Sequence, residues 1–541
     1  MGRREQKFWG WGEPGASPPL SEKVEGFLRS AFGVDGGVVS RPASLEDVVL
    51  PPCELSEAAR DRLVAIVGEA HVRQDRATRI LRATGKSYLD LLDQRSGRLD
   101  AAPDAVVAPG SAGEVQAVLD ACSRARVAVV PFGGGTSVVG GVAPQRGGAD
   151  AVVTLDLARL DHVVSLDERS RIARFEPGVR LPEADHVLGA RGYTLGHHPQ
   201  SYEWATVGGC VATRSSGQAS TGFGRIDEHV VALRCATPAG ELSTLAVPAS
   251  AAGPSLRELL TGSEGTLGVL IELTLEVRPV AEVRRYEGWV LGSFAEGAEV
   301  LRELAQTGLA PDVARLSDET ETQMGLALAG TGSLKARSGV SFLRARGAGE
   351  GCLLITGWEG GAQDVGRRRA WAARRLRAAR GRYAGRATGE AWRAGRYYAP
   401  HLRDHLLDRG VLVETLETAT TWSNLERLHG VVGDALRSAL DTRSLVACHV
   451  SHLYGSGASL YFTVLAGQDT AEPAAQWSRA KEAASRAIVD CAGTITHHHA
   501  VGRDHAAHLP SEVGTLGIDL LRGLKDRCDP VGVMNPGKLL L

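Results

Sequence analysis

Apolar residues follow different patterns along the chain, with changes near residues 101 and 281. Before residue 101 the pattern is mainly helical, as in the segment 57–67, where apolar residues recur at the spacing of one helix face. Beyond it, short apolar runs at 106–108, 127–130 and 151–155 predict buried strands. Ser111, three residues before Glu114, predicts a helix start between the first two runs. Residues 101–280 therefore predict a mixed unit of strands and helices.

A second mixed pattern begins after residue 280. Strand-like runs at 286–291 and 352–356, with a helix-like segment at 296–304 between them, predict a mixed α/β unit. The segment 330–347 is rich in Gly, Ser, Lys and Arg and predicts a mobile loop. The whole chain is thus expected to be α+β, with at least two units.

Charge gives little information about partners. The formal net charge is -2, which provides no general attraction to nucleic acid. One local exception is the basic run at 367–377. It predicts either a helix facing an anionic membrane or a solvated helix face with Trp371 and Leu376 underneath, and we favour the second interpretation.

Length and the absence of long apolar runs place further limits on the protein. A chain of 541 residues exceeds what one compact core usually holds, so two or three domains are expected. No apolar run approaches the roughly 20 residues that span a bilayer, and the first residues lack the apolar core of a secretion signal. We therefore expect an intracellular, cytoplasmic protein.

A glycine-rich segment directly follows the predicted strand at 127–130. It reads Pro131-Phe132-Gly133-Gly134-Gly135-Thr136-Ser137. Successive glycines let main-chain N–H groups converge on an anion, and the two hydroxyls add donors for phosphate oxygens. No Gly-Lys-Ser/Thr follows, as a nucleotide-triphosphate loop requires, and no helix is predicted behind the glycines, as a Rossmann turn requires. The segment predicts a diphosphate-binding loop, with an ordinary tight turn as the alternative.

Three more segments accompany this loop in order along the chain. They are Ala205-Thr206-Val207-Gly208-Gly209, Gly262-Ser263-Glu264-Gly265-Thr266-Leu267-Gly268 and Asn535-Pro536-Gly537-Lys538. With them, the sequence resembles FAD-binding proteins of the vanillyl-alcohol-oxidase type. The resemblance implies an α+β fold with a helical N-terminal region (1–100), a two-subdomain FAD-binding domain (101–280), a mixed α/β substrate or cap domain (281–495) and a C-terminal segment that returns to the flavin site (496–541).

The same resemblance implies the cofactor and the residues that hold it. In relatives whose flavin is covalently tethered through the loop, a His stands near the position of Thr136, so non-covalent FAD is implied here. The residues implied to contact FAD are Pro131, Phe132, Gly133, Gly134, Gly135, Thr136, Ser137, Thr206, Gly208, Gly209, Glu264, Gly265 and Thr266.

Three adjacent histidines, His497, His498 and His499, lie near the C-terminus. Imidazoles transfer protons near neutral pH, which favours a catalytic role beside a cofactor. Together with Ser459-Leu460-Tyr461-Phe462 they resemble the alkyldihydroxyacetonephosphate synthase family. The other segments that carry this resemblance are Phe8-Trp9-Gly10-Trp11-Gly12, Gly196-His197-His198-Pro199, Ala314-Arg315-Leu316-Ser317-Asp318 and Leu402-Arg403-Asp404.

The family resemblance implies a transferase that makes an ether-lipid precursor. It would exchange the acyl chain of acyl-dihydroxyacetone phosphate for a fatty alcohol, through an adduct at flavin N5 and with no net redox change. The partners implied are these small lipid substrates, a second copy of the chain in a homodimer, and a membrane surface at the periphery. No nucleic acid is expected.

Tyr461 and His498 are the candidates for proton transfer, and His497 and His499 are expected to place the flavin or the substrate. Each assignment has a simpler alternative. The three histidines are also compatible with a surface tract that binds metal incidentally, and Tyr461, between Leu460 and Phe462, is compatible with a core residue.

Two arginines and one further histidine complete the candidate site. Arg315 and Arg403 are candidates for the substrate phosphate or for the frame of the site, because guanidinium groups bind phosphate in a bidentate manner. Structural ion pairs are the alternative for both arginines. His197 is expected to line the same pocket. The family's Gly-His-Glu-Pro-Asp segment reads Gly-His-His-Pro-Gln at 196–200, which removes two acids near the flavin.

A flavin dehydrogenase of 2-hydroxy acids, of the D-lactate and glycolate type, is the rival hypothesis. Such proteins carry Gly-His-x-Gly-Asp-Gly-Asn-x-His and a later Gly-Glu-His-Gly, whose side chains can hold a divalent metal ion. Here Tyr461 replaces the second His and His498 replaces the Glu, so no metal site of this kind is expected. A third hypothesis is a flavin-binding protein without catalytic activity.

Overall fold

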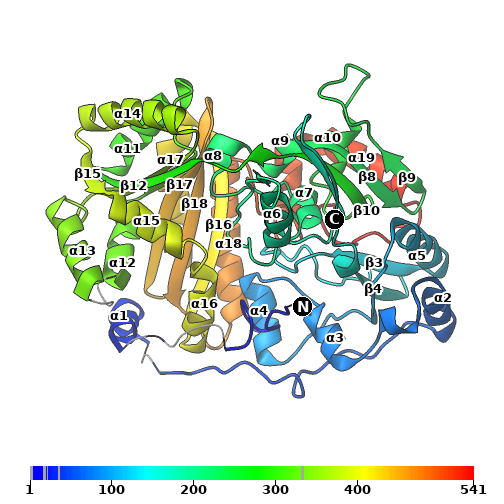
Figure 1. Ribbon diagram of the computed structural model, residues 1–541. Helices are drawn as coiled ribbons and strands as arrows, with labels where there is room; N and C mark the ends of the chain where they lie inside the picture. The colour runs from blue at the N-terminus through cyan, green and yellow to red at the C-terminus, as the bar shows by residue number, and fades with distance from the viewer. Residues whose placement is uncertain (1–3, 16–19, 21, 35–36, 330–333, 541) are drawn as a thin grey trace.

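The computed structural model describes residues 4–15, 20, 22–34, 37–329 and 334–540. These residues form four β-sheets (Figure 1). In spatial order, the four-stranded sheet consists of β1 (Val72–Arg73), β2 (Ala105–Val107), β4 (Ala151–Asp156) and β3 (Val127–Phe132), and the five-stranded sheet consists of β5 (Val163–Asp167), β6 (Ile172–Phe175), β10 (Val269–Glu276), β8 (Val230–Thr237) and β9 (Gly240–Ser243). A two-stranded sheet pairs β11 (Arg278–Pro279) with β7 (Tyr193–Thr194). The seven-stranded sheet consists of β15 (Arg382–Gly385), β12 (Val283–Leu291), β14 (Cys352–Gly360), β13 (Val313–Ser317), β17 (Ser444–Leu453), β18 (Gly457–Gly467) and β16 (Val411–Thr421).

Helices flank and connect these sheets. The α-helices are α1 (Glu22–Phe32), α2 (Glu57–Val67), α3 (Arg76–Leu81), α4 (Tyr88–Ser96), α5 (Ala112–Ala125), α6 (Leu181–Gly189), α7 (Val207–Ala212), α8 (Ser220–Phe223), α9 (Ile226–His229), α10 (Leu256–Leu260), α11 (Phe294–Gln306), α12 (Glu319–Ala329), α13 (Leu334–Ala345), α14 (Ala362–Ala378), α15 (Arg386–Gly395), α16 (Ala399–Asp408), α17 (Leu425–Ala439), α18 (Pro473–Asp490) and α19 (Leu509–Cys528). Short 3-10 turns are η1 (Glu69–His71), η2 (Leu157–Arg159), η3 (Trp422–Asn424) and η4 (Ala506–His508).

The four-stranded sheet carries the glycine-rich segment at the end of a strand. β2, β4 and β3 run parallel, and β3 ends at Phe132, directly before the glycines. The helix predicted after Ser111 is α5, whose first turn is capped by the Ser111 hydroxyl accepting the Glu114 N–H at 3.1 Å. Its apolar face packs into the core of this sheet with α2. The strands and helices predicted here are confirmed.

The five-stranded sheet is antiparallel and has a hydrophobic core of its own. Its core includes Val207 and Cys210 of α7, so the predicted second turn begins a helix that is fixed in apolar packing. Together the two sheets make the two-subdomain part of the expected α+β fold.

All strand pairs of the seven-stranded sheet are antiparallel. Helices α11, α14, α17 and α18 pack against it in one large hydrophobic core (Figure 1). Its register pairs Glu417 of β16 with Tyr461 of β18, and Tyr461 with His449 of β17. Three polar side chains, one from each of three neighbouring strands, therefore lie in one row across the sheet.

Two expectations for the second mixed unit have clear outcomes. The segment 330–347 was expected to be a loop, but α13 occupies residues 334–345, while residues 330–333 lie outside the described residues. The basic run is α14, with Leu376 buried below, Arg368 paired with Asp312 and Arg369 paired with Glu287. This run is therefore a helix that packs Leu376 into the core, and two of its arginines form ion pairs within the protein.

Among the described residues, no helix is both long enough and apolar enough to cross a membrane.

Candidate active site

The glycine-rich segment packs flat against the turn around residue 205. A Cβ atom at Gly134 would collide with the carbonyl group of Trp204, and one at Gly133 would collide with the Thr206 hydroxyl. Glycine is therefore required by close approach of two segments of backbone. Within the described part of the chain, the amides of residues 133–137 donate no hydrogen bond.

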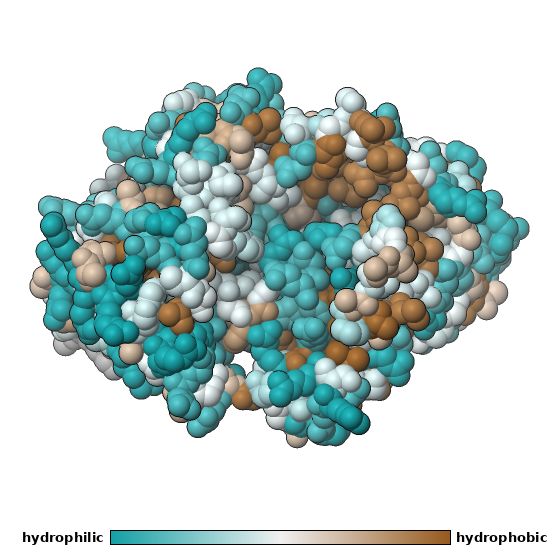
Figure 2. Space-filling view, turned by 90° about the horizontal axis from the view of Figure 1, so that it is seen from above, coloured by the Kyte–Doolittle hydropathy of each residue, from teal (hydrophilic) through white to brown (hydrophobic). Residues whose placement is uncertain are grey.

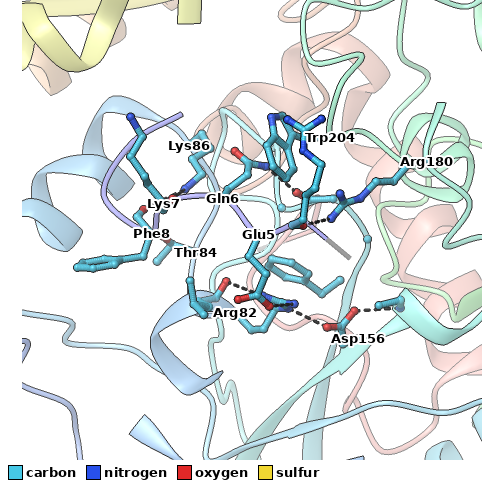
Figure 3. A pocket seen from close by; sticks show the side chains of 17 residues that line it. Glu5, Gln6, Lys7, Phe8, Arg82, Thr84, Lys86, Asp156, Arg180 and Trp204 are labelled. Atoms are coloured by element: carbon cyan, nitrogen blue, oxygen red, sulfur yellow. Dashed lines mark hydrogen bonds and ion pairs between the residues drawn. The ribbon is translucent and has the colours of Figure 1, made fainter. Parts of the chain in front are cut away.

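The same glycines line a pocket (Figure 3). Residues Glu5, Gln6 and Lys7 pass across it, and the Gln6 side-chain amide donates to the Gly134 carbonyl at 3.2 Å. Two basic residues, Arg82 and Lys86, bring positive charge to its wall. The sequence patterns did not point to these basic residues, since neither belongs to a recognisable motif.

The partners of Arg82 and Lys86 show how the pocket wall is built. The Arg82 Nε donates to Asp156 at 2.7 Å, which fixes the guanidinium against the end of β4. The Lys86 ammonium donates to two main-chain carbonyls, those of Lys7 and Phe8, at 2.8 and 2.9 Å. Burial lowers the pKa of Lys86 to about 7. A nearby anion would favour its charged form.

The second turn lies against the loop, and the third turn meets the C-terminal segment. Thr206 caps α7 by accepting the Gly209 N–H at 3.2 Å. Glu264, buried and in the left-handed region with φ 53°, accepts the main-chain N–H groups of Val501 and Gly502 at 2.8 and 2.7 Å. Burial raises the pKa of Glu264 to about 7, although these two hydrogen bonds oppose the shift.

The Asn535 side chain joins the C-terminal segment to the same place. Its amide donates to the carbonyls of Glu264 and Gly141 at 2.7 and 3.1 Å. Met534 forms a parallel bridge with Val129 of β3, so residues 533–535 lie alongside the strand that leads into the loop. All four segments that were expected to form one cofactor site are therefore brought together.

These features fit a dinucleotide diphosphate. Main-chain donors that lack partners inside a protein are costly, and phosphate oxygens satisfy several of them at once. The glycines at 133 and 134 leave no Cβ between the main chain and the adjoining turn. Residues 133–137 would hold the diphosphate of FAD.

The three histidines are held by one buried carboxylate, that of Glu417. Its oxygens accept the main-chain N–H groups of His497, His498 and His499 at 2.6, 3.1 and 2.9 Å. The Thr496 hydroxyl donates to it at 2.7 Å. Burial alone would raise the pKa of Glu417, but the three imidazoles and these donors hold it well below its usual value. Glu417 is thus an ionised acceptor that fixes the backbone of residues 496–499.

The rings of the cluster are in mutual contact. Tyr461 stacks on His498 with centroids 5.9 Å apart and on His449 with centroids 4.9 Å apart. His497 Nδ1 lies 2.9 Å from His498 Nδ1, and its Nε2 lies 2.6 Å from the Tyr454 hydroxyl. His499 lies against the edge of Tyr461 at 5.4 Å.

Burial sets the protonation states of these rings. It lowers the pKa of His497 and of His499 to about 3 and lowers that of His498 as well. It raises the pKa of Tyr461 to about 12. At neutral pH the cluster therefore holds neutral imidazoles, which can accept protons, next to a protonated phenol, which can donate one.

The two candidate arginines differ in their surroundings. Arg315 Nη2 pairs with Glu321 at 2.9 Å and its Nη1 lies 3.0 Å from His449 Nε2, so Arg315 belongs to the frame beneath Tyr461. Arg403 of α16 is buried, and its Nε has no hydrogen-bond partner among the described residues. The electrostatic influence of Arg403 lowers the pKa of buried Glu414, although burial of Glu414 outweighs it.

His197 is buried on the flavin side of the molecule. Its Nε2 lies 3.1 Å from the Ser215 hydroxyl, and its Nδ1 has no partner among the described residues. Burial, together with neighbouring histidines that include His498, lowers its pKa well below the usual value. It is therefore a neutral ring close enough to His498 for the two to influence each other.

The residues that follow the histidines contact the residues that follow the glycine loop. The N–H groups of Arg503 and Asp504 donate to the Val139 carbonyl, two residues beyond the loop, at 3.0 and 3.3 Å. Gly502 is required there because a Cβ would collide with that carbonyl. The chain thus passes from the imidazoles to the cofactor loop within a few residues.

Sequence reasoning missed four side chains of this site. Glu417, His449, His452 and Tyr454 all come from the seven-stranded sheet or its edge. One signal was available for Glu417, because a carboxylate in the apolar strand at 411–421 requires a buried partner. No pattern indicated what that partner was.

The loop, the capped turn and the returning C-terminal segment define a flavoprotein of the FAD-linked oxidase class. The family model described as "FAD binding domain" matches residues 103–246, and that described as "FAD linked oxidases, C-terminal domain" matches residues 280–539. FAD is therefore the cofactor, as expected. A probable mitochondrial D-lactate dehydrogenase of Danio rerio is 28% identical over 457 residues, which cover 81% of this chain and 84% of that protein.

A more specific similarity spans nearly the whole chain. The alkyldihydroxyacetonephosphate synthase of Dictyostelium discoideum is 30% identical over 546 residues, which cover 97% of this chain and 88% of that protein. A crystal structure of an alkyldihydroxyacetonephosphate synthase is 27% identical, covers 98% of each chain and superposes with a TM-score of 0.85. The chain belongs to the alkyldihydroxyacetonephosphate synthase family. The expected family and fold class are both confirmed.

Proposed function

We propose that this protein is an FAD-dependent alkyl transferase. It exchanges the acyl chain of acyl-dihydroxyacetone phosphate for a fatty alcohol and so forms the ether bond of a lipid precursor. Family membership over 97% of the chain supports this reaction. The observation that carries it is the stacked pair of Tyr461 and His498, a phenol and a neutral imidazole, where a 2-hydroxy acid dehydrogenase would need metal ligands.

The reaction is balanced without an external oxidant. The bond between C1 of the substrate and its ester oxygen breaks, a fatty acid leaves, and a bond forms between C1 and the alcohol oxygen. Bound FAD supplies an electrophilic ring system that can hold the substrate carbon between these two events. A proton must leave C1 at the start and return to it at the end.

His498 and Tyr461 suit these proton transfers. The imidazole of His498 is neutral because burial lowers its pKa, so it can accept the proton from C1. The phenol of Tyr461 remains protonated because burial raises its pKa to about 12, so it can donate a hydrogen bond to the departing carboxylate. His497 and His499 keep their backbone on Glu417 and thereby orient His498.

Arg403 is our candidate for the substrate phosphate. A buried guanidinium group with an Nε that lacks a partner is suited to a phosphate dianion. Arg315 is already paired with Glu321, and we assign it to positioning His449 beneath Tyr461. His197, with an unpaired Nδ1, is proposed to face the flavin from the other side. The cofactor is proposed to be non-covalent, since Thr136 offers no imidazole for a tether.

Product analysis tests this function directly. FAD-loaded protein is incubated with acyl-dihydroxyacetone phosphate and a long-chain alcohol, and mass spectrometry follows the ether product and the released acid. Equal amounts of both products are expected. If the ether product is absent and D-lactate or another D-2-hydroxy acid bleaches the flavin, the dehydrogenase alternative replaces this proposal.

We also propose that the protein acts as a cytoplasmic homodimer that touches a membrane surface. Leu516 and Leu520 of α19 are 71% and 68% exposed, and Leu256 and Leu259 of α10 are 47% and 41% exposed. Figure 2 shows apolar side chains gathered on the half of the upper face that carries these helices. Substrates with long alkyl chains partition into bilayers, which supports a lipid surface as the partner.

Vesicle binding tests the membrane contact. Wild-type protein is expected to sediment with phosphatidylcholine vesicles, and the double variant Leu516→Ser, Leu520→Ser is expected to stay in the supernatant. Sedimentation by both proteins alike would contradict this surface. Light scattering of the same wild-type sample gives the mass, for which twice 57.1 kDa is expected.

A further inference from the structure

His452, at the end of β17, joins two of the three adjacent histidines in a compact group. Its ring stacks on His497 with centroids 5.1 Å apart and meets His498 edge-on at 5.3 Å. One ring nitrogen from each of the three residues lies within 4.8 Å of the other two. Three nitrogens around a Zn²⁺ ion at about 2.1 Å are roughly 3.4 Å apart, so small ring rotations would produce this arrangement.

The surroundings of the group resemble those of metal-binding histidines. His452 is 4% exposed, and its Nδ1 has no hydrogen-bond partner among the described residues. The Tyr454 hydroxyl lies 2.6 Å from His497 Nε2 and would orient that ring, and His497 Nδ1 lies 2.9 Å from His498 Nδ1, where a metal ion would replace the direct contact between the two rings. Glu417, 3.5 Å from His498 Nδ1, adds a negative charge beside the group.

Protonation does not oppose metal binding here. A metal ion binds the neutral form of imidazole, and burial keeps the pKa of His452 and His498 below the usual value. Arg225, whose positive charge acts on His497 and His498, is paired with Asp227. Nitrogen ligands of this type favour Zn²⁺, Ni²⁺, Cu²⁺ and Co²⁺ over Mg²⁺ and Ca²⁺.

We propose that His452, His497 and His498 form a binding site for one divalent transition-metal ion with three nitrogen ligands. This set differs from the metal-binding pattern of the 2-hydroxy acid dehydrogenases. The neighbouring His449 is engaged by Arg315 and Glu321 at 3.0 Å each, and Tyr461 stands where the second His of that pattern would be.

The site has a consequence for activity that rests on the proposed function. A metal ion on His498 removes the lone pair that would accept a proton. Zn²⁺ at saturating concentration is therefore expected to inhibit turnover, and a chelator is expected to restore it. Binding itself is independent of the proposed function, so its measurement is decisive whatever reaction the protein catalyses.

Equilibrium dialysis of the FAD-loaded protein against ZnCl₂, followed by elemental analysis, tests the proposal. We expect one tightly bound Zn²⁺ per chain in the wild-type protein. His452→Gln and His498→Gln are each expected to weaken this binding at least ten-fold while the flavin absorbance is retained. Using two variants protects the test against a folding defect in one of them.

The control variant concerns a second, exposed group of possible ligands, Asp161, His162 and Glu176. His162→Gln removes one ligand of that group and is expected to leave the one tightly bound Zn²⁺ per chain in place. Loss of the tightly bound Zn²⁺ in His162→Gln, or equal Zn²⁺ binding by wild type and both cluster variants, would overturn the assignment.

Thermal unfolding gives an independent readout on the same samples. A ligand that binds only the folded protein raises the melting temperature. Zn²⁺ is expected to raise that of wild type and of His162→Gln, but not that of His452→Gln or His498→Gln. A rise of equal size in all four proteins would count against the site.

Discussion

The two halves of the site are built by opposite means. At residues 133–137 the main chain itself provides the donors, and glycine is needed because another segment of backbone lies against it. At residues 497–499 the side chains provide the chemistry, and the main-chain donors are used up by one carboxylate, Glu417. Among the described residues, the first half thus offers main-chain donors without partners, whereas the second positions titratable rings.

Adding a side chain to the glycine loop should give the largest effect, a loss of bound FAD. In Gly134→Val the new side chain would collide with the Trp204 carbonyl and displace the loop from the neighbouring turn. We expect the purified variant to contain less than about a tenth of the wild-type FAD, because the amides no longer converge. Flavin absorbance per chain measures this.

Gly148→Ala is the matched control for the loop variant. Gly148 lies in the same part of the chain, but a Cβ there meets nothing within 4 Å. Wild-type flavin content is expected in this control. Full FAD occupancy in Gly134→Val would mean that the loop is not the cofactor site.

Removing the reactive groups of the histidine half should lower turnover and leave FAD binding intact. Tyr461→Phe and His498→Ala are expected to keep FAD but to lower kcat by a factor of about 10² to 10⁴, the range typical of general acid–base groups. Tyr398→Phe, an exposed tyrosine, serves as the control. Wild-type turnover in either site variant would refute the assignment of that residue to proton transfer.

The same contrast explains what the sequence could predict. The loop, the turn at Thr206 and the turn at Glu264 are short segments that can be recognised from consecutive residues, and the structure brings them together. Strands β2, β3 and β4 of the flavin-binding half were likewise visible as apolar runs. Local chemistry and local periodicity are the two signals that a single sequence carries well.

The support of the histidines was not predictable in this way. Glu417 and His498 are 81 residues apart, and their contact depends on the register of β16 and β18 in the seven-stranded sheet. His452 reaches the cluster only because β17 pairs with β18 on the other side. Strand register follows from the packing of the whole sheet, so one sequence does not reveal it.

Glu417→Gln tests whether the carboxylate supports the cluster. The amide NH₂ of glutamine would face main-chain N–H groups that now donate to Glu417, and an unsatisfied buried donor costs about 1–3 kcal/mol. We expect a lower melting temperature and a 10- to 100-fold lower kcat with FAD retained, as for other residues that orient reactive groups.

The control for Glu417 is Glu426→Gln on the exposed side of α17, which is expected to behave as wild type. Unchanged kcat and unchanged melting temperature in Glu417→Gln would contradict the role of Glu417. A loss of FAD in this variant would show that the two halves of the site are less independent than their geometry indicates.

The dependence of stability on pH separates the two halves by its sign. In the cluster, His497 and His499 have a pKa of about 3 in the folded protein and about 6.5 when unfolded. A lowered pKa stabilises the fold above pH 6.5, and this contribution is lost as pH falls towards 3. In the loop region, Glu264 has a raised pKa of about 7, so its contribution is present below pH 4.5 and is lost as pH rises through 7.

Melting temperatures between pH 5 and pH 8 should therefore show a maximum. At pH 5.5 each of the two histidines is expected to cost about 1 kcal/mol of stability relative to neutral pH. Glu264→Gln removes the only one of these titrations that lowers stability as pH rises, a loss that runs from pH 4.5 to pH 7, so it should make the rise between pH 5 and pH 6.5 steeper and flatten the curve above pH 6.5. A variant whose acid side also flattens would show that Glu264 and the imidazoles titrate as one system, joined through the main chain of Val501 and Gly502.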